Sequence, residues 1–189
     1  MRIIAGELGG RPIKSPPGKG TRPMLARVRE ALFSTLTPEV PEARVLDLFS
    51  GTGSLGLEAL SRGAGSACLI EQDWRTAKLL RQNVATFELE DRADVVCGDA
   101  LAAELWGVGP WDIVFLDPPY PMVKDASGFE RVHAALTTLL EGALAPDGVC
   151  VLHAPRGQVR AMDLPEGYDA TLKEYGTQAL WYLRPGGNA

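Results

Sequence analysis

Residues 47–56 read Asp47-Leu48-Phe49-Ser50-Gly51-Thr52-Gly53-Ser54-Leu55-Gly56. An apolar segment precedes this run and an amphipathic segment follows it, so it predicts a strand, a glycine turn and a helix. The glycines have the G-x-G-x-x-G spacing of cofactor loops, where glycine permits positive φ and a close approach of the backbone to a ligand. Tight strand-to-helix turns without a ligand share this spacing, so the loop alone leaves the cofactor open.

Short apolar runs alternate with amphipathic segments on both sides of this loop. The apolar runs predict buried strands at 45–49, 67–70, 93–97, 113–116 and 149–152. The amphipathic segments predict helices at 25–36, 54–62, 74–87, 100–105 and 129–144. Segments 168–175 and 178–183, separated by a turn at Gly176, predict an antiparallel hairpin at one edge. The chain is therefore expected to form an α/β fold, a mostly parallel sheet with helices on both faces.

Composition excludes several classes of protein. The chain has 189 residues, of which 46% are hydrophobic and 23% charged, as in an ordinary globular domain. It has neither an apolar stretch of about 18 residues nor the apolar core of a signal peptide, so we expect a cytoplasmic protein without membrane contact. Cys68, Cys97 and Cys150 lie singly in apolar runs and predict buried thiols rather than a metal site. His133 and His153 have no partner motif, and we interpret them as a helix-surface and a strand-end residue.

Charge is unevenly distributed along the chain. The net charge is -5, yet residues 1–30 hold seven basic and two acidic residues, whereas the remainder holds 12 basic and 22 acidic residues. A basic segment on an acidic body predicts contact with a polyanion at one edge of the molecule. The basic residues expected to contact RNA phosphates are Arg2, Arg11, Lys14, Arg22, Arg27 and Arg29.

Acidic residues lie at or just after the ends of the first three strands of the predicted sheet. Asp47, in the first, would repel the pyrophosphate of NAD but suits a cationic ligand group. S-adenosylmethionine carries an ammonium and a sulfonium group and no phosphate, so it is the better electrostatic match. Glu71 after the second strand can accept from two ribose hydroxyls, and Asp99 after the third can accept from the adenine amine.

The fourth strand runs into Asp117-Pro118-Pro119-Tyr120. The amine of a nucleobase is a poor nucleophile because its lone pair is delocalised into the ring, so a methylating enzyme must orient it. The Asp117 side chain and the Pro118 carbonyl can accept its two N–H groups, with the prolines fixing the backbone. Tyr120 offers a face on which an extruded base can stack. This segment therefore predicts methyl transfer to a planar amino group.

Segments 47–64 and 117–120 together resemble the bacterial 16S rRNA guanine-N2 methyltransferases of the RsmD type, as do segments 2–6 and 27–33. The resemblance extends from residue 2 to about residue 184. It implies a Rossmann-like class I methyltransferase with a seven-stranded sheet. The implied activity is that of a 16S rRNA (guanine(966)-N2)-methyltransferase, which uses S-adenosylmethionine during ribosome assembly.

Site residues carry over from this resemblance by position. It implies cofactor contacts from Asp47, Gly51, Gly53, Glu71, Asp99 and Ala100, and guanine contacts from Asp117, Pro118 and Tyr120. The chain has Met24, Ala26 and Ser34 where the family usually has Thr, Asp and Asn, which removes candidate helix caps or site contacts. We expect a basic extension over residues 1–24, with a β-hairpin of residues 2–5 and 11–14, and a methyltransferase domain over residues 25–189. The expected protein is a metal-free monomer whose partner is ribosomal RNA or a small-subunit assembly particle.

Three other functions remain compatible with these residues. A related methyltransferase would act on another planar nitrogen, either adenine N6 of DNA or RNA or a glutamine amide of a protein. Enzymes of that kind often have Asn at the position of Asp117, which favours guanine here. A non-catalytic RNA-binding assembly factor is disfavoured because the cofactor carboxylates and Asp117-Pro118-Pro119-Tyr120 are intact. An NAD-dependent oxidoreductase is disfavoured by Asp47.

Overall fold

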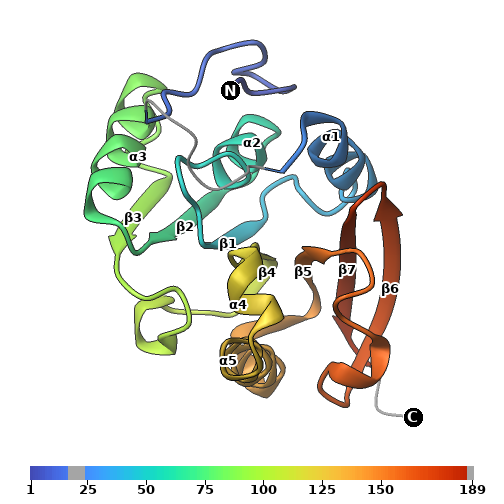
Figure 1. Ribbon diagram of the computed structural model, residues 1–189. Helices are drawn as coiled ribbons and strands as arrows, with labels where there is room; N and C mark the ends of the chain where they lie inside the picture. Colours follow the sequence, from blue (N-terminus) through green and yellow to red (C-terminus); the bar gives the residue numbers. More distant parts are fainter. Residues whose placement is uncertain (17–23, 187–189) are drawn as a thin grey trace.

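The structure, a computed structural model, describes residues 1–16 and 24–186. Its seven strands form one sheet in the order β3-β2-β1-β4-β5-β7-β6 (Figure 1). The strands are β1 (Arg44–Leu48), β2 (Ser66–Glu71), β3 (Ala93–Cys97), β4 (Trp111–Leu116), β5 (Leu144–Pro155), β6 (Tyr168–Tyr175) and β7 (Gln178–Pro185). The α-helices are α1 (Ala26–Thr35), α2 (Gly56–Ser61), α3 (Trp74–Thr86), α4 (Tyr120–Lys124) and α5 (Ala126–Thr138). Shorter helical segments are η1 (Ala103–Leu105), η2 (Leu139–Ala143) and η3 (Ala161–Asp163).

The two faces of the sheet are covered by different helices (Figure 1). Successive strand residues point to opposite faces. In β1, Val45 belongs to a buried cluster with α1, α2 and α3, whereas Leu46 and Leu48 belong to a second cluster with α4 and α5. Strands β1 to β5 pair in parallel, and β7 pairs antiparallel with both β5 and β6. The predicted seven-stranded, mostly parallel sheet with a C-terminal antiparallel hairpin is confirmed.

Several local predictions differ from the structure. The strand expected at 149–152 is longer, because β5 runs over Leu144–Pro155. The helix expected at 100–105 is reduced to the single turn η1, because the backbone at Ala102 is extended (φ -87°, ψ 101°) and helical geometry begins only at Ala103. The helix expected at 129–144 begins earlier, at Ala126, and gives way to η2, which contains the non-helical Gly142. Cys97 is exposed rather than buried, while Cys68 and Cys150 are buried as expected.

The N-terminal segment, residues 1–16, packs beside α2 and is hydrogen-bonded to it through the amides of Ile4, Ala5 and Leu8. The hairpin expected from residues 2–5 and 11–14 is a single antiparallel bridge between Arg2 and Pro12. Ile3, Leu8 and Ile13 join the buried cluster of α1, α2 and α3, so this segment contributes to the main hydrophobic core. Among residues 1–16 and 24–186, no helix is both long and apolar enough to cross a membrane.

Candidate active site

The glycine loop after β1 has the conformation that its sequence predicts. Gly51 and Gly53 have φ values of +57° and +91°, in the region that favours glycine. A Cβ atom on Gly53 would lie 2.6 Å from Cδ1 of Leu80, so a larger residue would clash with α3. No atom lies within 4 Å of the corresponding position on Gly51. The loop is therefore packed at Gly53 and open at Gly51.

Asp47 lies beneath this loop and is 1% exposed. Its Oδ2 accepts a hydrogen bond of 2.9 Å from the amide of Gly56, the first residue of α2. Oδ1 is buried without a hydrogen-bond partner among the described residues, which is the arrangement that a cationic donor on a ligand would complete.

Electrostatics at Asp47 point the same way. Burial raises the pKa of Asp47 to about 8 from its usual 3.8. The hydrogen bond from Gly56 opposes this shift in pKa, and the carboxylates of Asp117 and Glu71 increase it. These three acidic groups are therefore close enough to influence one another. A cation among them would relieve their repulsion.

Glu71 ends β2 and is held by two backbone amides. Its Oε2 accepts from the amide of Gly51 at 2.9 Å, and its Oε1 accepts from the amide of Asp73 at 2.8 Å. Each carboxylate oxygen can accept a second hydrogen bond, so both can still receive a ligand hydroxyl. The contact with Gly51 joins two predicted cofactor residues directly.

Asp99 and Ala100 follow β3 and have different surroundings. Asp99 Oδ1 accepts from the amide of Leu101 at 3.0 Å, and Oδ2 forms an ion pair with Arg131 of α5. Ala100 is 2% exposed, and its carbonyl accepts 2.8 Å from the indole N–H of Trp106. The carboxylate of Asp99 is therefore shared between the amide of Leu101 and the guanidinium of Arg131.

Asp117, Pro118 and Tyr120 connect β4 to α4. Pro118 is buried, whereas Tyr120, the first residue of α4, is half-buried. Asp117 Oδ1 lies 2.7 Å from Nδ1 of His153 in β5, and the Tyr120 hydroxyl lies 3.4 Å from Nε2 of the same ring. The side chain of Asp117 is 26% exposed, whereas that of His153 is 3% exposed, so Asp117 is the member of this pair that solvent or a substrate can reach.

The predicted acidic residues lie along one edge of the sheet. Strands β3, β2, β1 and β4 are neighbours in this order and are all parallel. Leu48 of β1 is in register with Ile70 of β2 and Leu116 of β4, so their carboxyl ends are level. The four carboxylates in strand order are Asp99, Glu71, Asp47 and Asp117. This edge is where open α/β sheets bind their ligands.

The predicted RNA-contact residues do not all reach the surface. Arg29 is 2% exposed and lies 3.9 Å from Glu58 of α2, with a hydrogen bond to the carbonyl of Arg2. Its expected contact with RNA is therefore wrong, because its guanidinium is used to hold the N-terminal segment. Arg22 lies outside the described residues. The remaining four, which are exposed, are Arg2, Arg11, Lys14 and Arg27.

Residues 11–16 extend along α3. Arg11 donates to the carbonyl of Thr86 and lies over the ring of Phe87 at the end of that helix. Lys14 exchanges two backbone hydrogen bonds of 3.0 Å with the side chain of Asn83.

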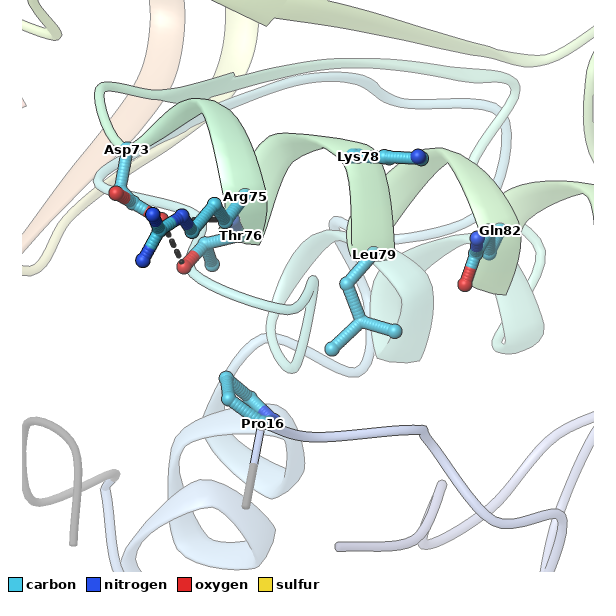
Figure 2. A pocket seen from close by; sticks show the side chains of 7 residues that line it. All are labelled: Pro16, Asp73, Arg75, Thr76, Lys78, Leu79 and Gln82. Carbon is cyan, nitrogen blue, oxygen red and sulfur yellow. Dashed lines mark hydrogen bonds between the residues drawn. The ribbon is translucent and has the colours of Figure 1, made fainter. Parts of the chain in front are cut away.

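Pro16 then faces Leu79 across an open hollow of about 580 Å³ (Figure 2). The hollow is also lined by Asp73, Arg75, Thr76, Lys78 and Gln82. The basic residues of the N-terminal segment and of α3 therefore share one side of the molecule.

Two residues at the site were missed by the sequence analysis. His153 was interpreted as a strand-end residue without a partner, yet it is 2% exposed and contacts both Asp117 and Tyr120. It follows the predicted strand 149–152, so the rule that singled out Asp99 and Glu71 would also have found it. Arg131 carried no signal, because its helix meets the end of β3 only in the folded chain. Within the described part of the chain, no cluster of three or more His, Cys, Asp or Glu residues could hold a metal ion.

Comparisons with known proteins agree with this geometry. A family described as conserved hypothetical protein 95 matches residues 1–184. A ribosomal RNA small subunit methyltransferase D from Escherichia coli K12 is 44% identical over 120 residues, which are 64% of this chain and 60% of that relative. The protein of the same name from Haemophilus influenzae is 38% identical over 186 residues, covering 96% of this chain and 91% of the relative.

A solved structure gives the same result for the fold. The methyltransferase yhhF from Escherichia coli superposes with a TM-score of 0.83 at 34% sequence identity, and the match covers 98% of each chain. The match includes the sheet and the strand ends that carry the four carboxylates.

Proposed function

This chain belongs to the conserved hypothetical protein 95 family, the RsmD family, and on that premise we propose that it transfers a methyl group from S-adenosylmethionine to the exocyclic N2 of a guanine in small-subunit ribosomal RNA. The observation that carries the proposal is the position of Asp117-Pro118-Pro119-Tyr120, which follows β4 beside the carboxylates of β1 and β2. The names of the relatives support the substrate class.

The residues present fit the proposed cofactor. Bound S-adenosylmethionine would supply an electrophilic methyl group on a sulfonium ion. The unpartnered Oδ1 of Asp47 suits its ammonium group, and the carboxylate of Glu71 suits the ribose hydroxyls. Asp99 would accept from the adenine amine while paired with Arg131. Gly51 has open space beside it that a ligand could enter. Gly53 and Ala100 are packed against the protein and would support the cofactor from beneath.

The proposed work of Asp117 is to orient the amine of the target base. Asp117 and the Pro118 carbonyl would accept the two N–H groups, so that the nitrogen lone pair turns out of the ring toward the methyl donor. Tyr120, at the start of α4, would stack on the extruded base. Any planar amino group with two N–H groups could make these contacts, so the preference for guanine rests on Asp rather than Asn at position 117.

We assign the approach of RNA to the side of the molecule where the N-terminal segment lies along α3. Arg11, Lys14, Arg75 and Lys78 define this surface, which we call the arm–α3 face. Phosphates would contact these side chains, with Arg2, which donates to the carbonyl of Gly10, adding charge nearby. Arg27 lies apart from this face, because its guanidinium is beside Gly176 in the turn between β6 and β7, at the opposite edge of the sheet from β3. Residues 1–24 thus act as an RNA-binding extension of the methyltransferase domain, and the substrate is the RNA itself or an assembling small subunit.

A single-turnover assay tests the proposal. The full chain is mixed with radiolabelled S-adenosylmethionine and either naked 16S rRNA or isolated small-subunit particles, and the methylated nucleoside is identified by mass spectrometry. We expect N2-methylguanine. Asp117→Ala should lower the rate by about a hundredfold or more while cofactor affinity changes little, because orientation acts on the chemical step.

Glu71→Gln separates cofactor binding from chemistry. It should weaken binding of S-adenosylmethionine by about tenfold or more, since a charge-assisted acceptor is lost. A product methylated on adenine N6, or on a protein glutamine, would replace the proposed substrate with another planar nitrogen. Absence of methyl transfer together with tight RNA binding would instead identify a non-catalytic assembly factor.

A further inference from the structure

His153 connects the elements that form the proposed base-binding site. It lies in β5, which pairs with β4 so that Leu152 is in register with Leu116. Its ring is 2% exposed, and its Nδ1 lies 2.7 Å from Oδ1 of Asp117. The ring also meets Tyr120 edge to face, with a centroid distance of 5.7 Å and an interplanar angle of 64°.

The hydrogen bonds of this ring have a defined direction. A carboxylate oxygen can only accept, so Nδ1 of His153 carries the hydrogen and donates to Asp117. In the neutral ring Nε2 is then an acceptor, and it faces the Tyr120 hydroxyl at 3.4 Å. One buried side chain thus contacts two of the three residues assigned to the target base, Asp117 and Tyr120.

This contact limits the freedom of Asp117. Asp117 follows the last residue of β4, and its side chain is 26% exposed, so a hydrogen bond is needed to fix the exposed part of its carboxylate. A short hydrogen bond from a buried donor fixes the position of Oδ1. The second oxygen, Oδ2, is then presented to the substrate.

We propose that His153 is a positioning residue for methyl transfer, holding one oxygen of Asp117 so that the other accepts from the amine of the target base, with Tyr120 supporting the far side of the ring. This inference rests on the proposed function. His153 itself need not touch the substrate.

Three substitutions separate positioning from simple packing. In Asn the amide nitrogen is as many bonds from Cα as Nδ1 is in His, so His153→Asn keeps a donor toward Asp117. His153→Gln places its amide nearer the position of Nε2, and His153→Leu fills the space without any donor. Under single-turnover conditions with saturating RNA and cofactor, we expect His153→Asn to remain within about fivefold of wild type and the other two to fall by about a hundredfold.

Cofactor affinity and thermal stability are measured for the same variants. S-adenosylmethionine binding should stay within about twofold of wild type, because Asp47 and Glu71 are untouched. Equal rates for the Asn and Leu variants, or losses of rate that follow losses of cofactor binding, would overturn the proposal.

A spectroscopic measurement keeps the inference independent of activity. The chain has only two histidines, so His133→Gln assigns the imidazole signals of His153 in a long-range ¹H–¹⁵N spectrum. We expect the Nδ1–H form in wild type and a mixture of tautomers in Asp117→Ala. If wild-type His153 is in the Nδ1–H form yet the protein methylates no RNA, the proposed function is wrong, but the hydrogen bond from His153 to Asp117 is confirmed. The Nε2–H form in the wild-type chain would refute the inference.

Discussion

Asp47 is a proposed cofactor-site residue whose pKa is shifted strongly by burial. The side chain is fully enclosed between β1 and α2, and burial raises the pKa of its carboxyl to about 8. In the unfolded chain the same group titrates near 3.8. Between these two values the folded protein binds a proton that the unfolded chain does not bind. The stability that this group contributes is therefore complete below pH 4 and is lost as pH rises toward 8.

Replacing Asp47 with Asn should remove this pH dependence. Wild type is expected to lose about 1.4 kcal/mol of unfolding free energy per pH unit relative to Asp47→Asn between pH 5 and 7, with the slope falling off as pH approaches 8. Urea unfolding of both proteins without cofactor measures the difference. Bound S-adenosylmethionine should reduce this difference in pH dependence between the two proteins, since its ammonium group favours the ionised carboxylate of Asp47. Parallel pH profiles for the two proteins would contradict the raised pKa of Asp47.

At the scale of elements, Glu58 of α2 attaches the N-terminal segment and α1 to the domain. It is 0% exposed and accepts from the amides of Ile4 and Ala5 at 2.7 and 3.0 Å. Arg62 donates to the same carboxylate at 2.8 Å, and Arg29 of α1 lies 3.9 Å away. Burial lowers the pKa of Arg29, and the charge of Glu58 opposes that effect. The buried carboxylate of Glu58 thus neutralises the buried guanidinium of Arg29.

Glu58→Gln should destabilise the protein, because it leaves Arg29 buried without its counter-charge. We expect a loss of about 3 kcal/mol of unfolding free energy. In a chain of this length that corresponds to a fall in Tm of about 10 °C. Trypsin should also cut more rapidly after Arg2 and Lys14, whereas the Arg11–Pro12 bond resists trypsin. Glu7→Gln is the matched control, since its ion pair with Arg92 is exposed and worth under about 1 kcal/mol.

At the scale of the whole molecule, the separation of charge in the sequence becomes a separation in space. The arm–α3 face brings Arg11 and Lys14 beside Arg75 and Lys78, and the described part of α3 contains no acidic residue. Trp74, at the start of α3, is 63% exposed and carries the guanidinium of Arg75 over its ring. A cationic side with an exposed aromatic residue suits a single-stranded segment of RNA.

Neutralising this face should weaken RNA binding in proportion to the contacts removed. For Arg75→Gln combined with Lys78→Gln, the slope of log affinity against log salt concentration should fall by about 1.4, at about 0.7 for each phosphate contact. Fluorescence anisotropy with a labelled rRNA fragment at several salt concentrations measures the slope. Arg160→Gln, an exposed arginine paired with Asp163 between β5 and β6, serves as the control. An unchanged slope in the double variant would show that Arg75 and Lys78 do not contact RNA phosphates and that the RNA-binding surface lies elsewhere on the protein.

Most of the fold could be predicted from the sequence because its signals are local. The apolar runs of β1 to β4 and the glycines of the loop after β1 each specify their own conformation within a few residues. The four carboxylates followed from one further rule, since parallel strands bring their carboxyl ends to the same edge. Family membership also followed from contiguous segments, because residues 47–64 and 117–120 carry their pattern without reference to the rest of the chain.

Contacts between distant segments depended on the folded chain. The charge of Arg29 suggested a surface residue, but the register of α1 against α2 directs it to Glu58. Nothing near His153 in the sequence indicates Asp117, because the two meet only when β5 takes its place beside β4. Strand order is determined by the packing of both helical layers onto the sheet, which is a property of the whole chain. The sequence therefore specified the elements and the acidic edge, whereas the pairing of buried charges and the support behind Asp117 arose from tertiary packing.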